Sequence, residues 1–134
     1  MSVDLRLYAL VDPDVGGGHD LADLSRQVAK GGATLVQLRD KTGSTLRMIE
    51  EAKAIKQALS GSFVPLLIND RVDVALAAGA FGVHLPERGL SIADARALGA
   101  TFVGVSCHTL AGVREAVDAG ADLIVGDRDV EAVA

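Results

Sequence analysis

The dipeptide Gly-Ala occurs four times in this chain, each time after a stretch with helical periodicity and before an apolar stretch of strand length. The copies begin at Gly32, Gly79, Gly99 and Gly120, so the last three lie 20 and 21 residues apart. Glycine adopts the left-handed conformation that often ends a helix. The first interval, of 47 residues, is long enough for two units, and the second of these units begins at Gly61 instead of at a Gly-Ala pair. The repeat therefore predicts a series of βα units with parallel strands rather than a mixed fold.

Hydrophobic periodicity places the elements of these units. Apolar runs of strand length cover residues 5–11, 34–38, 64–68, 81–85, 102–105 and 123–125. Between them, apolar side chains recur at helical spacing; the stripes are Leu21/Leu24/Val28, Ile49/Ala52/Ile55/Leu59, Ile92/Ala95/Leu98 and Val113/Ala116/Val117, with a shorter Ala-rich helix over 70–78. Helix starts are predicted by the capping residues Asp20, Ser44 or Thr45, Ser91 and Thr109.

Two α/β architectures can be built from such units. A doubly wound sheet usually carries a spaced glycine motif after its first strand, whereas this chain has the contiguous run Gly16-Gly17-Gly18, which we interpret as a connector. The alternative is the (β/α)₈ barrel of the TIM type, which rarely falls below about 200 residues. Because the chain has 134 residues and six strand runs, we predict a single α/β domain over residues 1–134, an incomplete TIM barrel with about six of the eight βα units present.

Composition excludes several classes of partner. The net charge is −5, aromatic residues make up 3% of the chain, and Lys and Arg do not cluster, so we expect no nucleic-acid binding. No apolar run approaches the ~20 residues that span a bilayer, and the start has no signal-peptide pattern, so we expect no membrane contact. The single cysteine, Cys107, excludes an internal disulfide and favours the reducing cytoplasm.

Polar and charged side chains gather directly after the second to sixth strand runs. These clusters are residues 37–41, 69–71, 84–87, 106–108 and 127–129, whereas the opposite strand ends carry Gly, Ala, Ser or Thr. Because the carboxyl ends of parallel strands share one face, this asymmetry predicts an active site there.

The cluster after the second strand run points to a bound anion. Alternation along a strand places Gln37, Arg39 and Lys41 on one side, with Leu38 and Asp40 on the other. An amide and two cations directed at one point would bind a polyanion such as pyrophosphate, Arg through its fork and Lys as a point charge. The alternative is a solvated basic patch on a half-exposed strand.

Four further residues have candidate roles. Asp70 could join Mg²⁺ to substrate phosphates, or cap the helix that follows it, or do both. Ser106 could donate to a phosphate oxygen or be an ordinary strand-end hydroxyl, and His108 could be an acid–base group or an ordinary loop imidazole. We interpret His84 as a packed or hydrogen-bonded residue rather than a catalyst, and Cys107 as buried and inert because no base accompanies it.

The chain from Leu7 to Ile124 resembles the superfamily of thiamine-phosphate synthase and thiazole tautomerase. The resemblance rests on five motifs in order: Gly-Gly-Ala-Thr-Leu-Val-Gln-Leu-Arg-Asp-Lys (31–41), Ile-Asn-Asp-Arg-Val-Asp-Val-Ala-Leu (68–76), Gly-Val-His-Leu (82–85), Gly-Val-Ser-Cys-His (104–108) and Gly-Ala-Asp-Leu-Ile (120–124). It implies a (β/α)₈ barrel and a transferase of thiamine biosynthesis. In that reaction hydroxymethylpyrimidine diphosphate loses pyrophosphate, and a thiazole phosphate captures the pyrimidine cation.

The resemblance also assigns roles to residues. It implies that the diphosphate is held by Gln37, Arg39, Lys41 and Asn69, that Asp70 ligates Mg²⁺, and that Ser106 contacts the leaving group. The ligands expected are therefore small phosphorylated molecules. Spreading leaving-group charge over Arg, Lys and Mg²⁺ lowers the barrier to pyrophosphate departure.

Two departures from the family pattern keep alternatives open. Where the synthases carry a second magnesium carboxylate this chain has Gly89, which weakens the metal site unless Glu87 substitutes for that carboxylate. The run Leu85-Pro86-Glu87-Arg88-Gly89 is more similar to the tautomerase branch, in which His108 would be the acid–base group. The loops expected to hold the thiazole phosphate also have no counterpart in the sequence. We expect either a fragment of a barrel, or closure by another copy or a second chain, or a non-catalytic anion-binding or oligomerising remnant.

Overall fold

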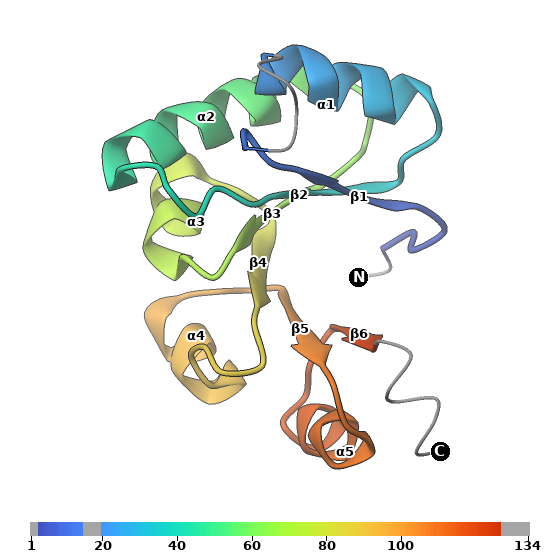
Figure 1. The fold of residues 1–134 in the computed structure, drawn as a ribbon, viewed down its shortest axis with the longest axis vertical. Helices are drawn as coiled ribbons and strands as arrows, with labels where there is room; N and C mark the ends of the chain where they lie inside the picture. The colour runs from blue at the N-terminus through green and yellow to red at the C-terminus, as the bar shows by residue number, and fades with distance from the viewer. Residues whose placement is uncertain (1–2, 15–19, 127–134) are drawn as a thin grey trace.

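A computed structural model describes residues 3–14 and 20–126, in which strands and helices alternate (Figure 1). The strands are β1 (Tyr8–Val11), β2 (Leu35–Leu38), β3 (Leu66–Asn69), β4 (Gly82–Leu85), β5 (Val103–Cys107) and β6 (Leu123–Gly126). The helices are α1 (Leu21–Lys30), α2 (Thr45–Ala58), α3 (Val72–Ala78), α4 (Ile92–Leu98) and α5 (Leu110–Asp118). The predicted run Gly16-Gly17-Gly18 and the cluster 127–129 lie outside the described residues.

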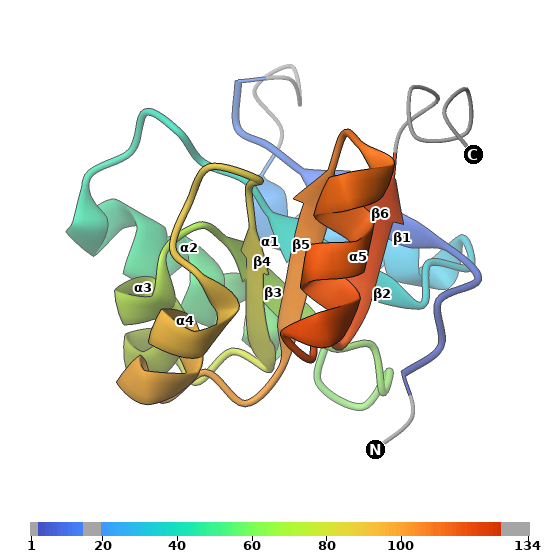
Figure 2. The same cartoon turned by 90° about the horizontal axis from the view of Figure 1, so that it is seen from below.

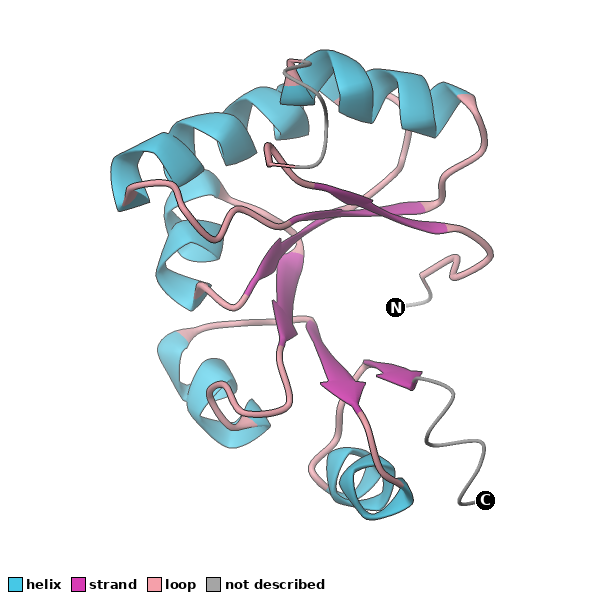
Figure 3. Ribbon diagram, viewed as in Figure 1, coloured by secondary structure: helices cyan, strands magenta, loops and turns pink. Residues whose placement is uncertain are grey.

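The six strands form one parallel sheet in the order β1-β2-β3-β4-β5-β6. Each strand pairs with the strands before and after it in the sequence, whereas a doubly wound sheet reverses its order partway. The sheet curls into an open arc with the helices outside the curve (Figure 3), and β1 and β6 are not paired with each other in the described residues. The predicted fold class, an incomplete TIM-type barrel, is confirmed.

Local signals determine where the helices begin and end. The side chains of Asp20, Ser44, Ser91 and Thr109 accept hydrogen bonds from first-turn amides of α1, α2, α4 and α5, as predicted. The glycines of the four Gly-Ala pairs all have positive φ, between 68° and 118°. Because L side chains rarely adopt this conformation, glycine is the residue that lets each helix turn into the next strand.

Two apolar layers pack on the two faces of the arc. The outer face and the helices bury a continuous core, and Figure 2 shows α5 lying against β5 and β6. A smaller cluster fills the inside of the arc, formed by Leu35, Leu67, Phe102 and Leu123. The prediction that Leu98 and Val117 belong to the buried faces of their helices is wrong. They are 57% and 60% exposed, because α4 and α5 each turn a narrower face toward the sheet. Within the described residues, no helix has both the length and the apolarity to cross a bilayer.

Candidate functional site

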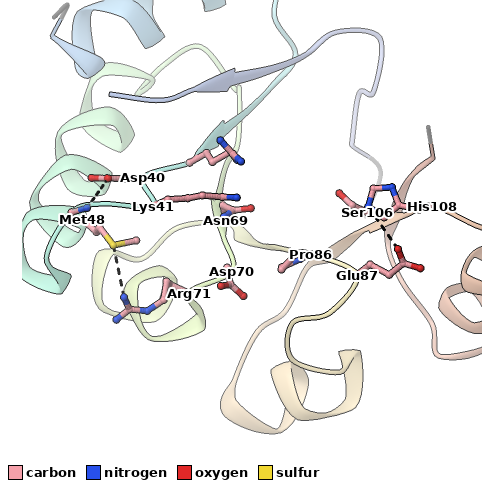
Figure 4. Close-up of a pocket in the computed structure, with 12 residues that line it drawn as sticks. Asp40, Lys41, Met48, Asn69, Asp70, Arg71, Pro86, Glu87, Ser106 and His108 are labelled. Carbon is pink, nitrogen blue, oxygen red and sulfur yellow. Dashed lines mark hydrogen bonds and ion pairs between the residues drawn. The ribbon is translucent and has the colours of Figure 1, made fainter. Parts of the chain in front are cut away.

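A cleft of about 590 Å³ lies at the carboxyl ends of β2 to β5 (Figure 4). The loops after these four strands all contribute to its lining, which includes Arg39, Lys41, Asn69, Asp70, Glu87, Ser106 and His108. Parallel pairing of neighbouring strands brings these loops to one edge of the sheet, as expected for a barrel. The structure therefore gathers the predicted polar clusters of four strands around one cavity.

Two cations stand on the β2 side of this cleft. Arg39 is half-exposed and forms an ion pair with Asp12, at 3.0 Å between Nη1 and Oδ2. Lys41 is exposed and, within the described residues, makes no ion pair; its side chain extends toward Asn69 (Figure 4). The ammonium of Lys41 is thus the less neutralised of the two positive charges.

Gln37 lies one layer deeper than expected. Strand β2 ends at Leu38, so the alternation that places Gln37 inside the arc does not continue through the loop to Lys41. Gln37 is 3% exposed and its amide nitrogen donates to the hydroxyl of Tyr8 at 2.8 Å. Gln37 lines an adjoining inner cavity of about 580 Å³, which shares Arg39, Asn69 and Ser106 with the cleft. The predicted convergence of the three side chains on one point is therefore corrected: Arg39 and Lys41 line the cleft, and Gln37 stands behind them.

Asp70 presents an exposed carboxylate to the cleft. Its backbone has a φ of 67°, and its amide donates to the carbonyl oxygen of His84 at 2.8 Å. Helix α3 starts only at Val72, with Arg71 at the cap position and no side-chain cap bond, so the expected capping role of Asp70 is wrong. The left-handed turn instead leaves the carboxylate of Asp70 available to a cation or a donor.

The loop after β4 does not bring a second carboxylate to Asp70. A Cβ atom at Gly89 would lie 3.1 Å from Oδ1 of Asp70, so this position does adjoin the predicted metal ligand. Glu87 lies across the cleft, where its Oε2 is 3.7 Å from Nε2 of His108 (Figure 4). Among the described residues, no group of three or more His, Cys, Asp and Glu side chains is placed to hold a metal ion. A cation here would rest on Asp70 and on the oxygens of a bound ligand.

A buried carboxyl pair supports the loop that carries the two cations. The side chain of Asp40 is fully buried, and its Oδ1 accepts the amides of Thr42 (3.2 Å) and Gly43 (2.8 Å). Arg47 bridges Asp40 and Glu51, at 3.1 and 3.4 Å. Burial, followed by a hydrogen bond with Asp40 and its negative charge, raises the pKa of Glu51 to about 7. Sequence reasoning missed Glu51, although its spacing from Arg47 is that of a helical ion pair.

A row of hydrogen bonds crosses the inside of the arc. The hydroxyl of Tyr8 lies 2.9 Å from Nδ1 of His84, and Nε2 of His84 lies 2.8 Å from the hydroxyl of Ser106. His84 is 4% exposed, and burial lowers its pKa to about 4. The predicted hydrogen-bonded role of His84 is confirmed, as is the burial of Cys107, which is 3% exposed. No pattern around Tyr8 marks it as a residue of the site.

Comparison with known proteins gives one consistent family. A family model described as thiamine monophosphate synthase matches residues 7–126. The thiamine-phosphate synthase of Agrobacterium fabrum is 53% identical over 94 residues, which are 70% of this chain and 43% of the relative. The putative thiamine-phosphate synthase of Geobacter sulfurreducens is 44% identical over 124 residues, 91% of this chain and 58% of the relative.

A solved structure agrees with these relatives. The thiamine phosphate pyrophosphorylase from Pyrococcus furiosus superposes with a TM-score of 0.84 at 32% identity, covering 91% of this chain and 59% of that protein. The chain thus spans about half the length of the curated relatives that it matches.

Proposed function

The chain belongs to the thiamine monophosphate synthase family, and on that premise we propose that it carries the diphosphate-binding part of a thiamine-phosphate synthase. The observation that supports this most directly is the cleft that Arg39, Lys41, Asn69 and Asp70 line together. The proposed reaction breaks the bond between the pyrimidine methylene carbon and the diphosphate oxygen. The bonding electrons leave with pyrophosphate, and the ring nitrogen of a thiazole phosphate then bonds to the carbon.

Arg39 and Lys41 would hold the diphosphate. A guanidinium can donate two parallel hydrogen bonds to phosphate oxygens, and an ammonium adds a compact positive charge. Negative charge grows on the leaving oxygens as the carbon–oxygen bond breaks, so cations fixed at that point stabilise the transition state more than the bound substrate. Asn69 supplies an amide donor from the neighbouring strand end.

Asp70 is the proposed magnesium ligand. Mg²⁺ in such sites commonly takes one or two protein carboxylates, together with substrate phosphates and water, so a single exposed carboxylate beside two phosphate-binding cations fits it. When bound, the ion would neutralise charge on the departing pyrophosphate. Ser106 is the proposed hydroxyl donor to the leaving group, and Gln37 supports the site from behind rather than contacting the diphosphate.

Calorimetric titration of the chain with pyrophosphate, with and without Mg²⁺, tests this function. We expect binding that Mg²⁺ strengthens, and we expect Asp70→Asn to lose that strengthening. Asparagine tolerates the left-handed backbone conformation of position 70, so this variant removes the charge without straining the turn. Asp118→Asn, at an exposed position at the end of α5, is the matched control. Failure of the unaltered chain to bind pyrophosphate under either condition would exclude the proposal.

A thiazole tautomerase is the second candidate. The observation that favours it is the pairing of His108 with Glu87 at the edge of the cleft, because a neighbouring carboxylate can orient an imidazole that acts as an acid–base group. This function predicts proton exchange on a thiazole carboxylate phosphate without added metal, lost in His108→Ala. If the chain neither binds pyrophosphate nor catalyses exchange, it is a non-catalytic member of the family.

Two features of the biological context complete the proposal. The single cysteine suits a reducing compartment, so we assign the reaction to the cytoplasm. The thiazole phosphate requires further loops, which we propose come from polypeptide outside the six described strands, whether of a longer form of this polypeptide, of another copy or of a second chain. Light scattering of the purified chain at several concentrations measures self-association directly.

A further inference from the structure

Four side chains from four different strands form a continuous hydrogen-bonded row inside the arc. The row runs from Gln37 on β2 through Tyr8 on β1 and His84 on β4 to Ser106 on β5, with separations of 2.8, 2.9 and 2.8 Å. Gln37 and His84 are 3% and 4% exposed. Of these four residues, only Ser106 lines both the inner cavity and the cleft.

We propose that this row is polarised in one direction, from Gln37 to Ser106, so that the hydroxyl proton of Ser106 is left for an anionic oxygen in the cleft. Tyr8 and His84 are then positioning residues, which act on the ligand only through Ser106. The identification of this oxygen as part of a diphosphate rests on the proposed function. The direction of the hydrogen bonds in the row is independent of that function.

The direction follows from what each group can donate. The amide nitrogen of Gln37 only donates, so the oxygen of Tyr8 accepts from it and turns its own proton toward Nδ1 of His84. A ring nitrogen that accepts a hydrogen bond carries no proton, so the proton of the imidazole sits on Nε2. Nε2 then donates to the oxygen of Ser106. One lone pair of Ser106 is occupied, and its proton is free to point into the cleft.

The reverse direction would give the cleft a different chemistry. If the amide of Gln37 were turned over, Tyr8 would donate to its oxygen, and the ring proton of His84 would move to Nδ1. Ser106 would then donate to Nε2 and offer only lone pairs to the cleft. Lone pairs repel a phosphate oxygen, whereas Arg39 and Asn69, which share both cavities with Ser106, contribute donors. A donating Ser106 matches these neighbours.

Packing holds the imidazole in the orientation that the row requires. Strand neighbour Gly104 lies beside the ring, and a Cβ atom there would be 2.9 Å from Nδ1. The ring of Tyr8 is tilted by 53° to the imidazole, with the ring centres 5.7 Å apart. The absence of a side chain at position 104 therefore makes room for the imidazole, and Tyr8 packs near it.

The tautomer of His84 tests the direction. In the chain labelled with ¹⁵N-histidine, long-range ¹H–¹⁵N correlation spectra distinguish a protonated from an unprotonated ring nitrogen. We expect one neutral form at pH 6–8, with the proton on Nε2. Tyr8→Phe keeps the ring but removes the hydroxyl, so we expect the single tautomer to give way to a mixture. A proton on Nδ1, or a charged imidazole throughout that range, would overturn the inference whether or not pyrophosphate binds.

Binding measurements test the consequence for the ligand. Ser106→Ala should weaken pyrophosphate binding by about tenfold or more, as for other hydrogen bonds to a charged group. Tyr8→Phe should weaken it in the same direction, and adding it to Ser106→Ala should produce no further loss, because Tyr8 acts only through Ser106. Ser60→Ala, at an exposed position after α2, is the control. Additive losses would overturn the positioning roles, whereas an unaltered chain that binds no pyrophosphate would overturn the proposed function.

Discussion

Replacing Glu51 with glutamine should remove most of the pH dependence that the buried carboxyl pair gives to folding. Oδ2 of Asp40 and Oε1 of Glu51 are both buried and form no hydrogen bond among the described residues, although Nη2 of Arg47 forms an ion pair with Oδ2 of Asp40 at 3.1 Å. One proton shared between the two carboxyl groups satisfies both oxygens. An amide at position 51 can donate to Asp40 in the same way, but it does not titrate.

The magnitude follows from the shift in pKa. The pKa of Glu51 rises from 4.5 to about 7 on folding, which corresponds to roughly 3 kcal/mol at about 1.4 kcal/mol per unit. Because the folded pKa lies above the unfolded one, the contribution is complete below about pH 4.5 and is lost as the pH rises through 7. The Glu51→Gln variant should therefore match the unaltered chain at low pH and exceed its unfolding free energy by up to roughly 3 kcal/mol near pH 8.

Urea unfolding followed by circular dichroism at a series of pH values measures this difference. Glu50→Gln is the matched control, because residue 50 is the exposed neighbour of Glu51 on the same helix. The unfolding free energy of this control should follow that of the unaltered chain at every pH. If the difference between Glu51→Gln and the unaltered chain stays constant across the range, the two carboxyl groups do not share a proton and the reasoning is wrong.

Three other substitutions test the site and the core. Lys41→Ala should weaken pyrophosphate binding by ~1.5–3 kcal/mol in calorimetry. Lys53→Ala, at an exposed position on α2, is the control. If Lys41→Ala binds pyrophosphate as tightly as the unaltered chain does, Lys41 does not contact the anion. Gly89→Asp adds a second carboxylate beside Asp70, and its Cβ also displaces the ring of Pro86, which would lie 2.9 Å away; the dependence of pyrophosphate binding on Mg²⁺ should steepen, and an unchanged dependence would separate position 89 from the metal. Leu67→Ala, which empties a fully buried position inside the arc, should lower the unfolding free energy by about 2–5 kcal/mol; a loss within error in urea unfolding would contradict the packing of that layer.

The features that sequence reasoning predicted correctly depend on neighbouring residues. Ser44 caps α2 because its hydroxyl reaches an amide three residues away, and Gly79 ends α3 because its own backbone conformation is left-handed. Both effects involve residues within one helical turn of each other, so the local sequence is enough to predict them. The order of the strands was predictable for a similar reason, since regular βα units of this length pair with their successors.

The features that sequence reasoning missed depend on distance in space. Alternation along a strand was extended from Gln37 to Lys41, but it holds only while the chain stays extended, and β2 ends at Leu38. Tyr8 and Glu51 acquire their roles from groups on other elements, His84 and Asp40, and no local pattern marks such partners.

The sequential order of the strands also bears on how the chain reaches this structure. Each strand hydrogen-bonds to partners supplied by the adjoining βα unit, so most of the sheet forms between segments close together in the chain. Pairing between neighbouring units keeps the loops that must close short, and so keeps the entropy cost of closing them small. A nascent polypeptide leaving the ribosome can therefore build the arc one unit at a time from β1, each finished unit serving as a template for the strand that emerges next.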